Sequence, residues 1–176
     1  MPDIVLRGTV SRNDLLRFQY FHIMRLIWPL EILTVTLTLV MVPAILLSDR
    51  MSFWKEGLEF SPFVLWTLMM NALPWWTGAR QYKTQAYLRE PVRYTFSGDG
   101  VSAAGESSSW TMAWKNLKRV RETKTLFVLY HGANVGVLVP KHFFESAEQM
   151  AQWRALVDAS APQSKIQKPG WLAALF

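Results

Sequence analysis

The sequence contains no cysteine, which excludes disulfide bonds and thiolate chemistry and leaves the redox compartment undetermined. It also lacks a Gly-x-x-x-x-Gly-Lys phosphate loop, a Gly-x-Gly-x-x-Gly dinucleotide turn and a Gly-x-Ser-x-Gly nucleophile elbow. Its three histidines, His22, His131 and His142, are far apart in the sequence and do not have the spacing of metal ligands. These absences predict a protein with no catalytic residues, no cofactor and no metal site, and therefore not an enzyme.

Charge is scarce in two long apolar segments. Residues 26–48 contain one charged residue, Glu31, and residues 60–79 contain none. As helices they would be roughly 34 and 30 Å long, enough to cross a hydrocarbon core of about 30 Å. Buried helices of a soluble bundle would show a polar stripe, which is absent from both. A cleaved signal peptide is disfavoured because the first segment starts late and ends without a small-x-small pattern. We predict a transmembrane hairpin of two helices over residues 26–79.

Residues that flank the hairpin predict its orientation. The basic residues on its terminal side are Arg12, Arg17, Arg25, Arg80, Lys83, Arg89 and Arg93, whereas the connector carries Arg50 and Lys55 together with three acidic residues. Aromatic residues gather at both borders, as in the aromatic belts of membrane proteins. The positive-inside rule therefore predicts a multi-pass protein of the inner (cell) membrane with both termini in the cytoplasm.

The rest of the chain predicts a small α+β domain. Residues 1–25 indicate a short strand and then a helix, which Ser11 and Asp14 open as a capping box. Within residues 80–160, apolar residues alternate at 92–96 and 110–114, residues 126–130 resemble a strand core, and residues 135–139 resemble its partner, with turn residues between them. A second capping box, Ser146 and Gln149, opens a helix. We expect an antiparallel sheet capped by this C-terminal helix.

The tail, residues 161–176, has two interpretations. Lys165 and Lys168 could meet anionic headgroups while Trp171 and Phe176 enter the membrane boundary, which would make the tail an interfacial anchor. The alternative is a mobile terminus that packs weakly on its own domain.

A basic stretch in the domain is the clearest candidate binding surface. Its residues are Lys115, Lys118, Arg119, Arg121 and Lys124. Beside a membrane, such a cluster suits anionic lipid headgroups, although a solvated strand face would have the same composition. Nucleic acid is not an expected partner, because the aromatic residues here alternate as core positions and form no exposed stacking platform.

Two polar residues lie within the predicted spans. Glu31 is about one turn inside the first, and Asn71 lies deeper in the second. Intramembrane polar groups are often functional, but Glu31 is close enough to the border to reach headgroups or Arg25, and Asn71 can join two helices by a hydrogen bond. We favour the structural interpretation of both. The alternative is a membrane-embedded enzyme or a transporter accessory subunit that uses Glu31, Asn71 or His22. A third hypothesis is an assembly subunit whose Trp75 and Trp76 pack on another membrane protein or on a second copy.

Several motifs together resemble a known family. They are a Tyr-x-Phe pair with a glycine turn at 94–100, Trp114 and Leu117, Glu122, and Val139-Pro140-Lys141 before the last helix. Their order resembles the YcxB-like membrane protein family over nearly the whole chain. The resemblance implies a cytoplasmic domain similar to bacterial pleckstrin-homology-like (PH-like) folds, with no established activity to carry over. We therefore expect a non-enzymatic membrane protein whose PH-like domain binds a protein or anionic lipid at the membrane surface.

Overall fold

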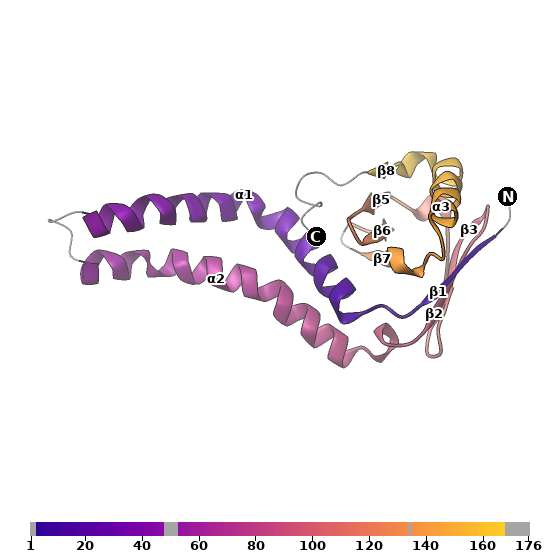
Figure 1. The fold of residues 1–176 in the computed structure, drawn as a ribbon, viewed down its shortest axis with the longest axis horizontal. Helices are drawn as coiled ribbons and strands as arrows, with labels where there is room; N and C mark the ends of the chain where they lie inside the picture. The colour runs from indigo at the N-terminus through magenta and orange to yellow at the C-terminus, as the bar shows by residue number, and fades with distance from the viewer. Residues whose placement is uncertain (1–2, 48–52, 134, 168–176) are drawn as a thin grey trace.

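The chain forms a helical hairpin that projects from a β-rich domain (Figure 1). The computed structural model describes residues 3–47, 53–133 and 135–167. Helices α1 (Arg12–Leu47) and α2 (Phe53–Thr84) pack side by side along the hairpin. Helix α1 passes without a break from the N-terminal flank into the first apolar segment, and α2 continues beyond the second, to Thr84.

The two helices differ in hydropathy. Among the described residues, one segment, Ile27–Ala44 of α1, is long and apolar enough to cross a membrane, and only 6% of it is buried inside the protein. No segment in the described part of α2 reaches the same hydropathy. The predicted helical hairpin is therefore confirmed, but the prediction that both helices span the membrane is not.

The domain contains two four-stranded sheets. The first has the order β1-β2-β3-β4 and is antiparallel throughout, with strands β1 (Ile4–Gly8), β2 (Val92–Phe96), β3 (Gly100–Ala104) and β4 (Ser109–Ala113). The second has the order β7-β6-β5-β8, with strands β5 (Arg119–Glu122), β6 (Leu126–Tyr130), β7 (Gly136–Pro140) and β8 (Ile166–Gln167). Its β5–β8 pair is parallel, which the sequence did not predict.

Strand β1 joins the two ends of the hairpin. It precedes α1 in the chain, yet it pairs with β2, which follows α2, so that Ile4 lies opposite Phe96 and Gly8 opposite Val92. The domain therefore consists of residues from both sides of the hairpin, and not of residues 80–160 alone.

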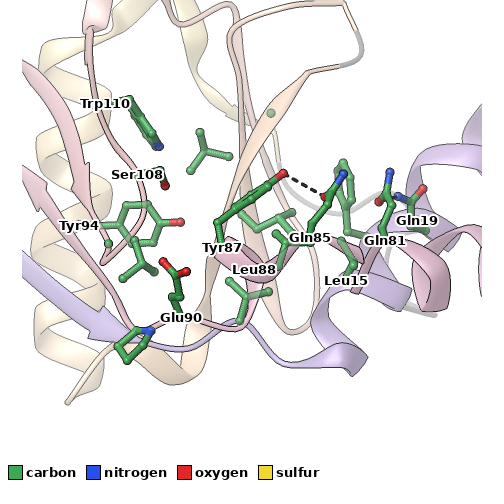
Figure 2. Close-up of a pocket in the computed structure, with 18 of the residues that line it drawn as sticks. Leu15, Gln19, Gln81, Gln85, Tyr87, Leu88, Glu90, Tyr94, Ser108 and Trp110 are labelled. Atoms are coloured by element: carbon green, nitrogen blue, oxygen red, sulfur yellow. Dashed lines mark hydrogen bonds between the residues drawn. The ribbon is translucent and has the colours of Figure 1, made fainter. Parts of the chain in front are cut away.

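The base of the hairpin packs against the domain. The Gln19 amide of α1 donates a 2.7 Å hydrogen bond to Gln81 of α2, and the 3-10 turn η1 (Ala86–Leu88) leads from α2 to β2. A cavity of about 480 Å³ lies where both helices meet strands β2, β4 and β7 (Figure 2). The hairpin and the two sheets thus enclose a shared space.

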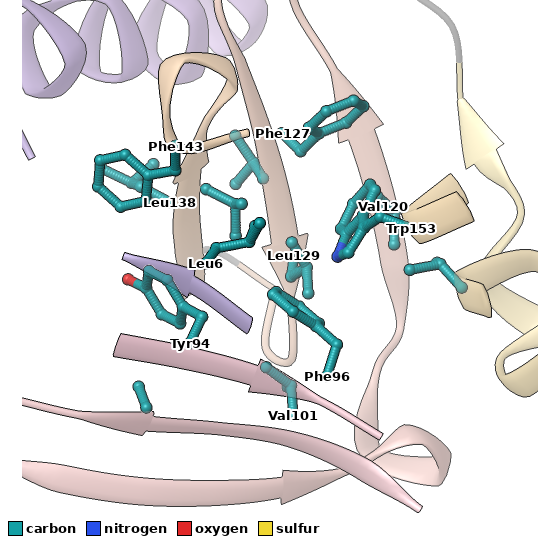
Figure 3. Close-up of a cluster of buried hydrophobic side chains, with 14 of the residues drawn as sticks. Leu6, Tyr94, Phe96, Val101, Val120, Phe127, Leu129, Leu138, Phe143 and Trp153 are labelled. Carbon is teal, nitrogen blue, oxygen red and sulfur yellow. The ribbon is translucent and has the colours of Figure 1, made fainter. Parts of the chain in front are cut away.

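The core lies between the two sheets (Figure 3). Leu6, Tyr94 and Phe96 of the first sheet face Phe127 and Leu129 of the second, and all five side chains are buried. This confirms the alternation predicted at 92–96. Strand β6 is buried at every position because its other face is covered as well: Tyr130 on that face stacks on His22 of α1, with ring centroids 6.3 Å apart.

Helix α3 (Ala147–Ser160) closes the domain. The predicted capping box is present, because the Gln149 N–H donates to Ser146 Oγ at 3.1 Å. On the inner face of α3, Trp153 is fully buried, with its ring 5.6 Å from Phe96 and 4.5 Å from Phe127. One side chain therefore bridges the two sheets, and apolar burial on this scale stabilises the fold.

Two local predictions were wrong. Trp114 lies in the 3-10 turn η2 (Trp114–Asn116) and not in a strand, and Val135 precedes β7 with 57% of its surface exposed. The C-terminal residues 168–176 lie outside the described part of the chain, so the predicted anchor of Lys168, Trp171 and Phe176 stays a prediction.

Candidate functional site

The five basic residues of the candidate surface lie on and around strand β5. Lys115 belongs to η2, Lys118 lies between η2 and β5, and Lys124 follows β5 in the turn to β6. Arg119 and Arg121 alternate along β5 with Val120, which is fully buried in the core. The two arginines therefore share the face of the second sheet that points away from the core.

Helix α1 partly covers this arginine face. The Arg119 guanidinium lies 4.4 Å from the Tyr130 ring centroid and donates a 2.7 Å hydrogen bond to the Ala133 carbonyl. The Arg121 guanidinium lies 6.0 Å from the ring of Phe21, a buried residue of α1. Cation–π contacts at these distances hold both side chains against the protein. Arg121 thus contacts the hairpin, whereas Arg119 is held within the domain, and both are less exposed than Lys115 and Lys118.

Lys115 and Lys118 face an open hollow. It has a volume of about 650 Å³, and its other lining residues include Trp110, Met112, His131 and Val137. Both lysines are exposed. The hollow thus combines two ammonium groups with an apolar floor, an arrangement that suits a molecule with an anionic head and an apolar part.

Lys124 lies away from this hollow. Its neighbour Thr125 accepts a hydrogen bond from the Lys141 backbone N–H. The residue after Lys141, His142, lies 3.9 Å from Asp14 in the first turn of α1. Tyr130, at the opposite end of β6, contacts His22, which is two turns further along α1. Lys124 therefore lies near the start of α1, whereas Lys118 lies further toward the first apolar segment. The predicted cluster therefore divides into three parts, which are Lys115 and Lys118 at the hollow, Arg119 and Arg121 on the outer face of β5, and Lys124 near the start of α1.

Trp110 and His131 are lining residues that the sequence analysis did not assign to this site. Trp110 was assigned to the core and His131 to a turn, and no local pattern relates them, since β4 and the β6–β7 turn meet only through the arrangement of the two sheets.

Glu122, which is part of the motif that resembles the family, forms ion pairs with two basic residues. Its carboxylate pairs with Lys141 at 2.6 Å and with Arg154 of α3 at 2.8 Å, and both cations lie over the Phe127 ring. Burial raises the pKa of Glu122, but hydrogen bonds from Lys141 and Arg154 and their charges outweigh it, so the pKa lies below its usual value. Through its pair with Arg154, Glu122 joins β5 to α3.

The two polar residues of the apolar segments contact each other. Asn71 Nδ2 donates to Glu31 Oε1 at 2.6 Å and to the Thr67 carbonyl at 2.8 Å. Asn71 thus joins the two helices, as predicted. Glu31 Oε2 is buried without a hydrogen-bond partner. His22 stacks on Phe18 and Tyr130 and does not join this pair.

The comparisons with known proteins support the resemblance found in the sequence. The model of the YcxB-like protein family matches residues 96–157. The chain is 24% identical over 121 residues to "Uncharacterized protein YcxB" of Bacillus subtilis (strain 168). This alignment covers 68% of the chain but 65% of that protein, slightly less than two thirds of its length. No solved structure matches.

Proposed function

Since residues 96–157 are a YcxB-like region, we propose that this chain is a non-enzymatic inner-membrane protein whose PH-like domain binds anionic lipid headgroups. In this proposal the hairpin crosses the membrane twice, and both termini and the domain are cytoplasmic. The observation that carries the proposal is the hollow lined by Lys115 and Lys118, together with its position near the first apolar segment.

The surface of the hairpin supports insertion of both helices. Leu39 of α1 is 70% exposed, and Leu65 and Leu68 of α2 are 64% and 62% exposed. Soluble proteins rarely expose contiguous apolar surface of this extent. The Arg80 guanidinium lies over the Trp76 ring, 5.5 Å from its centroid. A tryptophan paired with a basic residue suits the interface between lipid and water.

The pairing of β1 with β2 supports an even number of crossings. Both strands belong to one sheet, so the segments before α1 and after α2 must lie on the same side of any membrane. If α1 crosses it, α2 must cross back, despite its lower hydropathy. The basic flanks then favour the cytoplasmic side.

The location of the hollow supports a lipid ligand. His131 in its lining follows Tyr130, which contacts His22, and His22 precedes Ile27, the start of the candidate span, by five residues or about 7.5 Å of helix. Lys115 and Lys118 therefore lie close to the level of headgroups. Each basic side chain near an anionic surface contributes about 1 kcal/mol of binding.

The two-span topology predicts which sites a membrane-impermeant maleimide can reach. Because the chain has no cysteine, a single introduced cysteine is the one thiol that the maleimide can label in each variant. We expect Ser52→Cys in the connector to react in intact cells, and Glu145→Cys in the domain to react only after the inner membrane is permeabilised. Equal labelling of both positions in intact cells would contradict the two-span topology.

Charge reversal of the hollow should reduce lipid selectivity. In nanodiscs that contain phosphatidylglycerol and phosphatidylethanolamine, the wild-type full-length chain should retain phosphatidylglycerol preferentially after detergent extraction, as measured by mass spectrometry. Lys115→Glu with Lys118→Glu should lower this enrichment by about an order of magnitude, given the contribution of each basic residue. Lys124→Glu lies outside the hollow and is the matched control.

Unchanged enrichment in the double variant would contradict the lipid proposal. The same mass spectra test the alternative function, a membrane-embedded accessory subunit, which is favoured by the buried oxygen of Glu31 that lacks a partner. A stoichiometric protein that co-purifies with the wild type and is lost in Glu31→Gln, but retained in the double variant, would support that alternative.

A further inference from the structure

The cavity between the hairpin and the domain has aromatic walls and one carboxylate. Figure 2 shows Tyr94 and Trp110 on one side, Tyr87 on the other, and the Glu90 carboxylate between them. The rings of Tyr94 and Trp110 are 6.3 Å apart and inclined at 58°. They form two adjacent walls of a partial cage, which comes from β2, β4 and η1 and not from a single element.

The charge of the lining differs from that of the chain. The formal net charge of the protein is +6, yet the described lining contains no lysine or arginine, and Glu90 is its one acidic residue. Glu90 Oε2 accepts hydrogen bonds from the Ser107 hydroxyl at 2.7 Å and from the Ser107 N–H at 2.9 Å. These bonds fix the carboxylate beside the rings and lower its pKa, so it is ionised at neutral pH.

We propose that this cavity binds an organic cation that carries an alkylated ammonium group, either as a free molecule or as a lipid headgroup. Aromatic faces attract such cations through their negative electrostatic potential, and rings that surround the cation recognise quaternary ammonium groups. The Glu90 carboxylate supplies the opposite charge. The cavity volume of about 480 Å³ lies within the usual range for small-molecule sites.

The charge of the cavity favours a cationic ligand over the anionic headgroups proposed for the hollow of Lys115 and Lys118. The described lining of the cavity contains the Glu90 carboxylate and no lysine or arginine, whereas that of the hollow contains two lysines and no acidic residue. The cavity and the hollow are neighbours, because Trp110 and Val137 line both. They differ in charge preference and not in their level along α1, since His22, five residues before Ile27, also lines the cavity.

Choline and its uncharged isostere, in which a tert-butyl group replaces trimethylammonium, test the proposal. With the full-length chain in a maltoside detergent, calorimetry should show choline binding and at least about tenfold weaker binding of the isostere, since only choline gains the cation–π and charge interactions. Glu90→Gln and Trp110→Leu should each weaken choline binding by about tenfold. Glu106→Gln, an exposed acid of the β3–β4 turn that does not line the cavity, should leave choline binding unchanged.

Other results of these binding measurements would contradict the proposal or identify the source of the ligand. Equal affinity for choline and its isostere, or unchanged choline binding in Glu90→Gln, would overturn the proposal. If Trp110→Leu fails to fold by circular dichroism, Tyr87→Leu tests the opposite wall, because the Tyr87 side chain is 52% exposed and tolerates replacement. In nanodiscs, displacement of choline by phosphatidylcholine would assign the cavity to a lipid headgroup, whereas undiminished choline binding would assign it to a soluble cation.

Discussion

A fragment of residues 90–160 should fail to fold, because it lacks β1. Leu6 is 1% exposed and Ile4 8% exposed, and both belong to the core that the two sheets share. Loss of one fully buried leucine side chain typically costs about 2–5 kcal/mol, comparable with the stability of a small domain. The fragment also lacks β8, the partner of β5. Circular dichroism and urea titration should show no cooperative unfolding.

A matched fusion distinguishes the loss of β1 from the loss of the hairpin. Gly8 lies opposite Val92 in the sheet, so a short Gly-rich turn can join residues 3–8 directly to residues 91–167. This soluble protein should unfold cooperatively, and Leu6→Ala within it should lower the free energy of unfolding by about 2–5 kcal/mol. Cooperative unfolding of the 90–160 fragment at the same urea midpoint as the fusion would refute the role of β1.

Gly100→Ala should be strongly destabilising, whereas Gly98→Ala in the same turn should be tolerated. A Cβ atom at Gly100 would lie 2.3 Å from the Met112 carbonyl oxygen and 3.0 Å from the Ala113 Cα, both atoms of the paired strand β4. Backbone atoms cannot rotate away, so β3 and β4 must separate. Overpacking of this kind typically costs about 1–3 kcal/mol and sometimes more.

The control position has open space. A Cβ at Gly98 meets no atom within 4 Å, and neither glycine has a positive φ, so backbone conformation does not distinguish the two substitutions. Urea unfolding of the two variants in the soluble fusion measures the difference. Equal midpoints would mean that β4 shifts to accommodate the methyl group at little cost.

Local signals in the sequence predicted most elements of this fold. Ser11 with Asp14 and Ser146 with Gln149 form hydrogen bonds between neighbours in the chain, so the sequence alone shows both capping boxes. The alternation at Tyr94 and Phe96 likewise depends only on the period of a strand. The pairing of β1 with β2 could not be predicted in this way, because its partners are separated by the whole hairpin. The parallel pairing of β8 with β5 could not be predicted either, because a strand of two residues shows no periodic pattern.

The candidate site was less predictable than the fold. The basic stretch could be identified from its charge. The sequence could not show that Lys115 and Lys118 are more exposed than Arg119 and Arg121, because this difference depends partly on where α1 lies. The cation–π contact between Arg121 and Phe21 joins residues one hundred positions apart. The cavity with Glu90 was missed for a related reason: its walls come from η1, β2, β4 and the two helices, and no short motif contains them.

The place of β1 in the first sheet also determines the order of events during synthesis. The ribosome releases Ile4 long before Phe96, its partner, and both long helices are made in between. Strands β2, β3 and β4 are consecutive and can pair as soon as they emerge, whereas β1 must wait unpaired until α1 and α2 have packed together. Their packing brings the two ends of the hairpin close together, which removes most of the entropic cost of closing so long a loop. Maturation of the domain is therefore coupled to assembly of the hairpin, and a nascent chain with a defective hairpin would keep an open sheet edge that chaperones and proteases can recognise.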